Sequence, residues 1–222
     1  MTTPVVVYGA GGMGREVAET VLARSEADGS LELIGFVDDD PDAVGTQIHG
    51  IPVVGDGTWV REHPGVPVVL GIGHPRIRHQ VVHKVLGMGG EWQTVIHPSV
   101  KVAPSAKVGT GAVIFAGCVL SSDATVGAYS YVNYNAVVCH DAVVSDFACI
   151  MALVALSGNV QVGEGTFVGM GATTRQGVRI GKWSIVGASA CVVRDIPDYC
   201  VAMGVPAVPS RRYQGREEMP KY

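Results

Sequence analysis

Several features that would assign this chain of 222 residues to a common class are missing from it. No apolar run approaches the length of a membrane span, and the opening residues 1–19 lack the basic region of a signal peptide and are interrupted by glycines. The five cysteines show no C-x-x-C spacing. A net charge of -4 and a pI of about 5.9 argue against the basic face that nucleic acid requires. We therefore expect a cytoplasmic protein with reduced cysteines and with neither nucleic acid nor a membrane as partner.

What the chain has instead is a six-residue period in its second half. A mark placed every six residues from Ile96 to Val192 lands on an aliphatic side chain at every position except Thr174. The aliphatic marks are Ile96, Val102, Val108, Ile114, Leu120, Val126, Val132, Val138, Val144, Ile150, Leu156, Val162, Val168, Ile180, Val186 and Val192. Four residues after a mark the side chain is usually small, as at Ala112 and Ala136. This period matches neither a helix nor an alternating strand.

A six-residue unit is one short strand plus a turn, and three units make one triangular coil of a parallel β-helix. The marks therefore predict roughly five and a half coils, above the minimum of about three repeats that a solenoid needs. A β-sandwich with chance spacing is the alternative, but its strands would show period two and irregular loops. We divide the chain into a domain of residues 1–92 and a β-helix domain of residues 93–222 that includes the C-terminal tail.

The first domain is predicted to open with a strand–helix–strand unit. A buried strand at Pro4–Tyr8 precedes a G-x-G-x-x-G loop and a helix to about Arg24, and a second strand at Leu31–Val37 ends in Asp38 and Asp39. The loop glycines are Gly9, Gly11, Gly12 and Gly14. Glycines there let the backbone approach a phosphate, and Asp38 stands at about the distance where an acidic residue meets a ribose hydroxyl.

Beyond this unit we expect a short strand or hairpin at Ile48–Val54, a strand at Val66–Gly71 and a helix from Pro75 to about Met88. A dinucleotide normally lies across two such halves, and the first domain is long enough for one. A nucleotide-sugar or another mononucleotide is the favoured ligand. A dinucleotide and a glycine turn needed only for packing stay as alternatives.

Five motifs together resemble the bacterial sugar acyltransferases of the PglD and NeuD types. They are GAGGMGREVAE after the first strand, FVDDD at the end of the second, His140-Asp141, Gly158-Asn159-Val160 and Gly204-Val205-Pro206-Ala207. The resemblance covers essentially the whole chain. It implies an α/β Rossmann-like half domain with a parallel sheet, followed by a left-handed parallel β-helix of hexapeptide repeats. It further implies a homotrimer whose active sites lie between neighbouring β-helices, with acetyl-CoA along the helix groove and the nucleotide-sugar reaching in from the N-terminal domain.

The candidate catalytic residues are His140 and Asp141. His140 follows the mark at Val138 by two residues, on the turn side of the strand, where a histidine is exposed or at an interface and can act as general base. In the family the acidic residue at the position of Asp141 orients the imidazole. The alternative for His140 is a solvated turn histidine without a catalytic role. The alternative for Asp141 is a turn carboxylate that accepts hydrogen bonds from its own backbone.

The resemblance also implies main-chain contacts to the cofactor. The backbone N–H at the position of Gly158 meets the thioester oxygen, a second backbone contact falls at Met170, and Asn133 matches a position near the active site. Two alternatives remain open: Gly158 is only a turn glycine, and Asn133 is only a structural turn residue. Two departures from the family pattern are Met13 and Cys149, since many members carry histidine at both positions, near the acceptor or the acetyl group.

A catalytic metal is not expected, because His97 and His140 are the only histidines within the repeat and zinc needs a larger ligand set. We predict an acetyl-CoA-dependent N-acetyltransferase acting on the amino group of a nucleotide-linked deoxyamino-sugar, such as a UDP- or dTDP-4-amino-sugar. The loop glycines, Asp38, Asp39 and Arg78 would hold the nucleotide. A sugar O-acetyltransferase of the sialic-acid type and a non-catalytic nucleotide-sugar-binding trimer are the alternatives.

Overall fold

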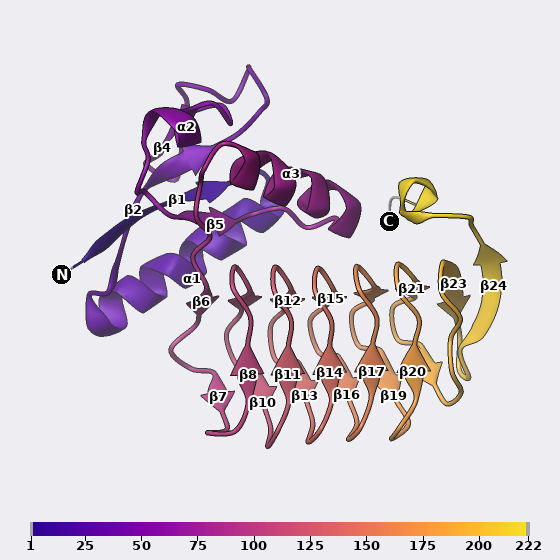
Figure 1. The fold of residues 1–222 in the computed structure, drawn as a ribbon. Helices are drawn as coiled ribbons and strands as arrows, with labels where there is room; N and C mark the ends of the chain where they lie inside the picture. The colour runs from indigo at the N-terminus through magenta and orange to yellow at the C-terminus, as the bar shows by residue number, and fades with distance from the viewer. Residues whose placement is uncertain (1, 221–222) are drawn as a thin grey trace. The chain divides into compact units, whose positions relative to one another are not determined.

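The computed structural model describes residues 2–220, and the chain divides into two compact units. The first unit runs up to Gly73 and resumes over Ile77–Pro98, and the second holds His74–Arg76 and the chain from Ser99 onward. This division places residues 93–98 with the first unit, beyond the boundary drawn from the sequence after residue 92. Figure 1 shows the elements of both units in chain order.

The first unit is built on a sheet with strand order β3-β4-β2-β1-β5. Its elements are β1 (Thr3–Tyr8), α1 (Gly12–Asp28), β2 (Leu31–Val37), β3 (Gln47–Ile48), β4 (Ile51–Gly55), α2 (Trp59–Glu62), β5 (Val68–Leu70), α3 (Pro75–Gly87) and β6 (Val95–Ile96). Strand β1 pairs in parallel with both β2 and β5, and its last four residues are buried. The apolar run Val5–Val7 explains this central place, because a parallel strand covered on both faces needs apolar side chains on both. The predicted half-Rossmann sheet is confirmed.

The second unit is a left-handed parallel β-helix of hexapeptide repeats, as predicted. Its coils consist of two-residue strands: β7 (Lys101–Val102), β8 (Lys107–Val108), β9 (Val113–Ile114), β10 (Val119–Leu120), β11 (Thr125–Val126), β12 (Tyr131–Val132), β13 (Val137–Val138), β14 (Val143–Val144), β15 (Cys149–Ile150), β16 (Ala155–Leu156), β17 (Gln161–Val162), β18 (Phe167–Val168), β19 (Thr173–Thr174), β20 (Arg179–Ile180), β21 (Ile185–Val186) and β22 (Cys191–Val192). Every third strand pairs in parallel, so the coils build three flat sheets (Figure 1).

The second residue of each strand is the aliphatic mark, and it points into the prism. Ile114 and Ile150 are fully buried, and Thr174, the exception in the pattern, is only 8% exposed. Val102 in the first coil is 40% exposed, since it lies at the beginning of the stack. Three residues after a mark the chain turns a corner with positive φ, as at Asp141, where φ is 59°. Asparagine, aspartate and glycine tolerate this left-handed conformation best.

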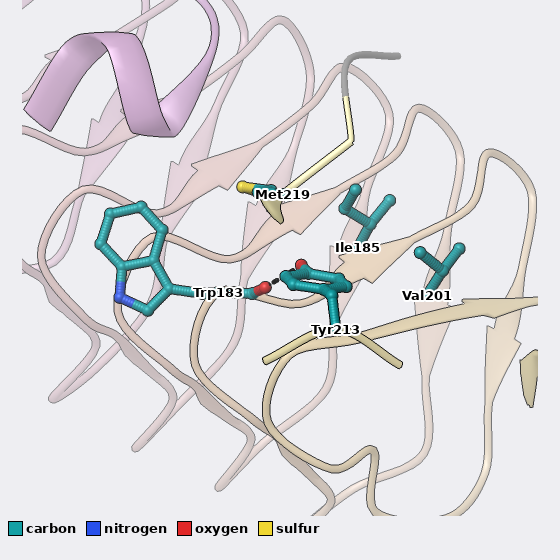
Figure 2. Close-up of a cluster of buried hydrophobic side chains, with 5 residues drawn as sticks. All are labelled: Trp183, Ile185, Val201, Tyr213 and Met219. Carbon is teal, nitrogen blue, oxygen red and sulfur yellow. Dashed lines mark hydrogen bonds between the residues drawn. The ribbon is translucent and has the colours of Figure 1, made fainter. Parts of the chain in front are cut away.

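The C-terminal tail closes the end of the β-helix. Strand β23 (Cys200–Met203) pairs in parallel with β21, and β24 (Val208–Arg212) returns antiparallel along β23 before the 3-10 helix η1 (Arg216–Glu218). Figure 2 shows the apolar cluster that holds the tail, in which the Tyr213 hydroxyl donates to the Trp183 carbonyl. The cluster comprises Trp183, Ile185, Val201, Tyr213 and Met219. The tail therefore caps the last coils, as terminal segments of solenoids commonly do.

Candidate functional site

His140 lies in the turn that follows β13, and its side chain is 53% exposed. Its Nδ1 is 2.8 Å from Oδ2 of Asp141, the next residue at the same corner. An ionised carboxylate accepts hydrogen bonds and cannot donate them, so Nδ1 carries a proton, and in the neutral ring Nε2 is the nitrogen with the lone pair. The structure thus brings together the two residues predicted as base and orienter, and leaves the basic nitrogen available.

Gly158, one coil further on, lies directly against the His140 ring. A Cβ built on Gly158 would overlap the Cε1 and Nε2 atoms of that ring. The Gly158 carbonyl accepts from the Gly177 N–H at 3.0 Å, whereas no backbone hydrogen bond of the described chain uses the Gly158 N–H. The glycine therefore makes room for the imidazole, and an uncommitted N–H belongs to the residue beside Nε2.

The two other β-helix candidates differ in accessibility. Met170 is 53% exposed at a corner, and its carbonyl accepts from the Ser189 N–H at 2.8 Å. Asn133 is only 3% exposed, and its amide oxygen accepts from the Tyr134 N–H at 2.7 Å. Met170 is therefore accessible although its carbonyl is hydrogen-bonded, while the Asn133 side chain is engaged by its own turn.

The two positions that depart from the family pattern are both occupied by packed side chains. Cys149 has no exposed surface. Met13 is half-buried in the glycine loop, where a Cβ on Gly73 would lie 3.7 Å from its Cβ. Neither side chain supplies a titratable imidazole.

In the first unit, two of the four loop glycines are required by packing. Gly9 has a φ of 106°, and a Cβ there would lie 2.8 Å from the Gly71 carbonyl oxygen. A Cβ on Gly14 would overlap the carbonyl oxygen of Gly9. These two positions therefore fit the packing interpretation of the motif, because the backbone after β5 approaches Gly9, and Gly14 of helix α1 approaches the Gly9 carbonyl, too closely for a side chain.

The other two loop glycines face open space. No atom lies within 4 Å of a Cβ built on Gly11, and Gly12 meets only the end of Arg15 at 3.9 Å. Helix α1 starts here without a side-chain cap and without an acidic residue in its first turn. A helix start with unused N–H groups and a positive dipole end favours an anion such as a phosphate.

Asp38 ties the glycine loop to the end of β2. Its Oδ2 accepts from the Ala10 N–H at 2.7 Å, and its Oδ1 accepts from the Asp40 N–H at 2.9 Å. Each carboxylate oxygen can accept a second hydrogen bond. Asp38 is thus held in place with capacity left for a ribose hydroxyl.

Asp39 is the centre of a cluster that sequence reasoning missed. Its carboxylate accepts from the Tyr8 hydroxyl at 2.8 Å, the Lys84 ammonium at 2.6 Å and the Gly57 N–H at 3.1 Å. Partial burial favours the neutral acid, but these three donors outweigh it and lower the pKa of Asp39. Burial, with the Asp39 charge, raises the pKa of Tyr8 to about 12, so the phenol stays a donor. The sequence could have indicated the contact between Tyr8 and Asp39, because Tyr8 ends β1 beside the end of β2. No local sequence pattern indicated that Lys84 joins them.

Arg78 has a different place from the one expected at the nucleotide end. It is fully buried, and its Nε and Nη2 donate at 2.9 Å to the carbonyl oxygens of Ile72 and Gly73. Its side chain therefore shapes the loop after β5 and presents no surface to a ligand.

Within residues 2–220, no three His, Cys, Asp or Glu side chains gather closely enough to hold a metal ion. Among the helices of that same span, none is both long and apolar enough to cross a membrane.

Comparison with known proteins places both units in one family. Residues 4–85 match the family described as PglD N-terminal domain. A histidine-to-asparagine variant of perosamine N-acetyltransferase from Caulobacter crescentus, in complex with CoA and GDP-perosamine, is 35% identical with a TM-score of 0.86 over 95% of this chain and 98% of that one. The acetyltransferase domain of PglB from Neisseria gonorrhoeae FA1090, in complex with acetyl coenzyme A, is 32% identical with a TM-score of 0.86 over 95% and 100%.

A more local similarity is to galactoside O-acetyltransferase from Lactococcus lactis, 43% identical over 53 residues, or 24% of this chain and 26% of that protein. The chain spans about a quarter of the length of the curated relatives it matches, 26% and 27%. The whole-length similarity comes from the solved structures, and it includes both the half-Rossmann unit and the β-helix. The chain belongs to the bacterial sugar acyltransferase family of the PglD/NeuD type.

Proposed function

We propose that the protein is an acetyl-CoA-dependent N-acetyltransferase acting on the amino group of a nucleotide-linked deoxyamino-sugar. One observation carries the proposal: His140, bound through Nδ1 to Asp141, lies with Nε2 against Gly158, whose N–H is uncommitted. Support also comes from the 35% identical enzyme whose structure contains CoA and GDP-perosamine.

The surroundings of His140 fit an acyl-CoA co-substrate. The imidazole is about half exposed, and Met170, two hexapeptide units after Gly158, is exposed as well. When bound, acetyl-CoA supplies an electrophilic thioester carbonyl carbon. A carbonyl that gains negative charge needs a donor, and the Gly158 N–H is the backbone donor at this turn.

In the proposed reaction His140 moves the proton. Its Nε2 accepts a proton from the attacking amino group as the new N–C bond forms and the C–S bond breaks. The imidazolium then returns the proton to the departing CoA sulfur. Asp141 stabilises the charged ring through Nδ1, which keeps the ring in one orientation throughout.

The first unit is proposed to hold the nucleotide. The uncapped start of α1 at Gly11 and Gly12 suits the phosphates, and Asp38 suits a ribose hydroxyl. Asp39 would then support this edge through Tyr8 and Lys84.

We further propose the homotrimer that the family resemblance implies. The sheet of β10, β13 and β16 turns Val119, Val137 and Ala155 outward, and each is partly buried. The neighbouring sheet turns out Val143 and otherwise polar residues, such as Gln161 and Arg179. A flat apolar face on a solenoid is suited to association with other copies. Sedimentation should give a trimer; a monomer at micromolar concentration would reject the proposal.

Acetyl transfer is tested with a panel of acceptors. The protein is incubated with acetyl-CoA and GDP-, UDP- or dTDP-linked 4-amino-sugars, each paired with its hydroxyl analogue, while free thiol is followed. Release with an amino-sugar and none with its analogue supports N-transfer. Release with the hydroxyl sugars alone would instead assign O-transfer, which the local similarity to a galactoside O-acetyltransferase makes worth testing. No release with any acceptor would reject catalysis.

A further inference from the structure

The β-helix is held by a regular backbone ladder with a single departure. The N–H of the residue after each mark donates to the carbonyl of the mark one coil further on. Cys139 donates to Leu156 at 3.0 Å, Met151 to Val168 at 3.0 Å and Arg175 to Val192 at 2.7 Å. From Ala103 to Arg175 every such residue follows this rule except Ser157.

At Ser157 side chains replace the ladder bond. The Ser157 N–H donates to the Thr174 Oγ1 at 2.9 Å, and the Ser157 hydroxyl donates to the Thr174 carbonyl at 2.6 Å. The strand register records the same departure, because β16 pairs with β19 only through Ala155 and Thr173. The strand pairs on either side, β13 with β16 and β19 with β22, keep both residue pairs. The ladder is thus open at one rung.

The cause is the one mark that is not aliphatic. Thr174 is only 8% exposed inside the prism, where every other mark is aliphatic, so packing does not require its hydroxyl. A buried hydroxyl needs partners, and Thr174 also donates to the Ala155 carbonyl at 3.5 Å. Valine has nearly the same shape but no hydroxyl, so it would let the Ser157 N–H return to the Thr174 carbonyl.

The open rung lies next to the residue that carries the proposed oxyanion donor. Ser157 directly precedes Gly158, and the peptide unit joining them supplies the Gly158 N–H. Gly158 in turn lies against Nε2 of His140. The hydrogen bonds of Ser157 therefore hold the residue from which this peptide unit extends beside the imidazole.

We propose that Thr174 and Ser157 are positioning residues that orient the Gly158 N–H beside His140. Neither residue touches the reacting atoms. The inference rests on the proposed function for its kinetic consequence, but the open rung is a property of the chain itself.

The test uses Thr174→Val, Thr174→Ser and Ser157→Ala in the full-length protein. Loss of one oxyanion donor costs about 10²–10³ in kcat, so a misaligned donor in Thr174→Val should cost about 10–100-fold in kcat with KM for acetyl-CoA little changed. Thr174→Ser keeps the hydroxyl and should retain most activity, and Ser157→Ala should lie between the two. The control Thr125→Val makes the same change on an outward strand position and should match the wild type.

Two further measurements separate this inference from the proposed function. The structure of Thr174→Val should show the Ser157 N–H bonded to the residue 174 carbonyl, and thermal unfolding should be unchanged or raised. If the wild type transfers no acetyl group, the proposed function fails, and the structure alone decides whether Thr174 opens the rung. Wild-type kcat in Thr174→Val, or an open rung that persists there, would overturn the inference. If Thr174→Val does not fold, Ser157→Ala takes its place, and a kcat equal to that of the wild type would overturn the inference.

Discussion

The glycine loop of the first unit and the His140 turn of the second both present backbone N–H groups, but they reach that result differently. At the start of α1 the groups are unused because of helix geometry, and Gly11 and Gly12 face open space. At the His140 turn, Gly158 is covered by the imidazole, and a departure in the ladder accompanies it. The first arrangement suits a ligand that already carries its charge. The arrangement at the His140 turn suits a group that gains negative charge during a reaction, next to a proton acceptor.

The largest expected effect comes from removing the proton acceptor. His140→Ala should lower kcat by roughly two to four orders of magnitude, because general-base catalysis contributes about that much. Nucleotide binding, measured by calorimetry with the nucleoside diphosphate, should be unaffected, since the proposed nucleotide site lies in the first unit. Wild-type turnover in this variant would remove His140 from the mechanism.

Gly158→Ala asks whether the glycine is needed only for space. Gly158 does not have a positive φ, so the methyl group is opposed mainly by the His140 ring, which can move away. We expect kcat to fall by about 10–100-fold through displacement of the base. A double-mutant cycle supplies the control: the same change in a His140→Ala background should cost little more. Equal costs in both backgrounds would mean that the methyl group acts on something other than the imidazole.

The glycine loop predicts a split between stability and binding. Gly14→Ala should destabilise the protein by about 1–3 kcal/mol, because its Cβ would overlap the Gly9 carbonyl oxygen. Gly12→Ala should leave stability unchanged or raise it by up to about 1 kcal/mol while weakening nucleotide binding. Urea unfolding and calorimetry measure the two quantities. Equal destabilisation by both variants would contradict the division into packing and ligand-facing glycines.

The smallest effect is expected at Asp39 and depends on pH. Its pKa is lowered from 3.8 in the folded protein, so its stabilising contribution is fully present above that value and is lost as the pH falls through the folded pKa. The Asp39 and Lys84 side chains are 47% and 44% exposed, so Asp39→Asn should cost about 1 kcal/mol or less at neutral pH. The difference from the wild type should shrink in urea unfolding at acid pH. A difference in unfolding free energy that stays constant across the pH range would mean that Asp39 stabilises the protein through packing and not through its charge.

Much of the fold could be predicted because the repeat is both long and uninterrupted. A strict period in the marks determines which side chain enters the prism, and the same count places His140 and Asp141 on a turn. The Thr174 exception was visible in the sequence, but its hydrogen bonds to Ser157 depend on the distance between two coils, which no local pattern contains.

The first unit shows what could not be predicted. Lys84 meets Asp39 across 45 positions of sequence, and Arg78 turns into the core although a charged side chain usually stays exposed. Both contacts depend on how α3 is rotated about its axis. The sequence could offer packing only as an alternative role for Gly9 and Gly14, because a motif gives the spacing of the glycines and not the atoms that approach them.

The antiparallel return of β24 bears on how a repeating protein limits its own growth. A stack of parallel coils ends in a row of unpaired backbone groups on which another coil, or another molecule, can add. Strand β24 pairs with the last of these edges in the opposite direction, and it carries Pro209, which has no N–H to offer. The C-terminal tail therefore stops the addition of further coils at this edge, and so it limits the length of the β-helix.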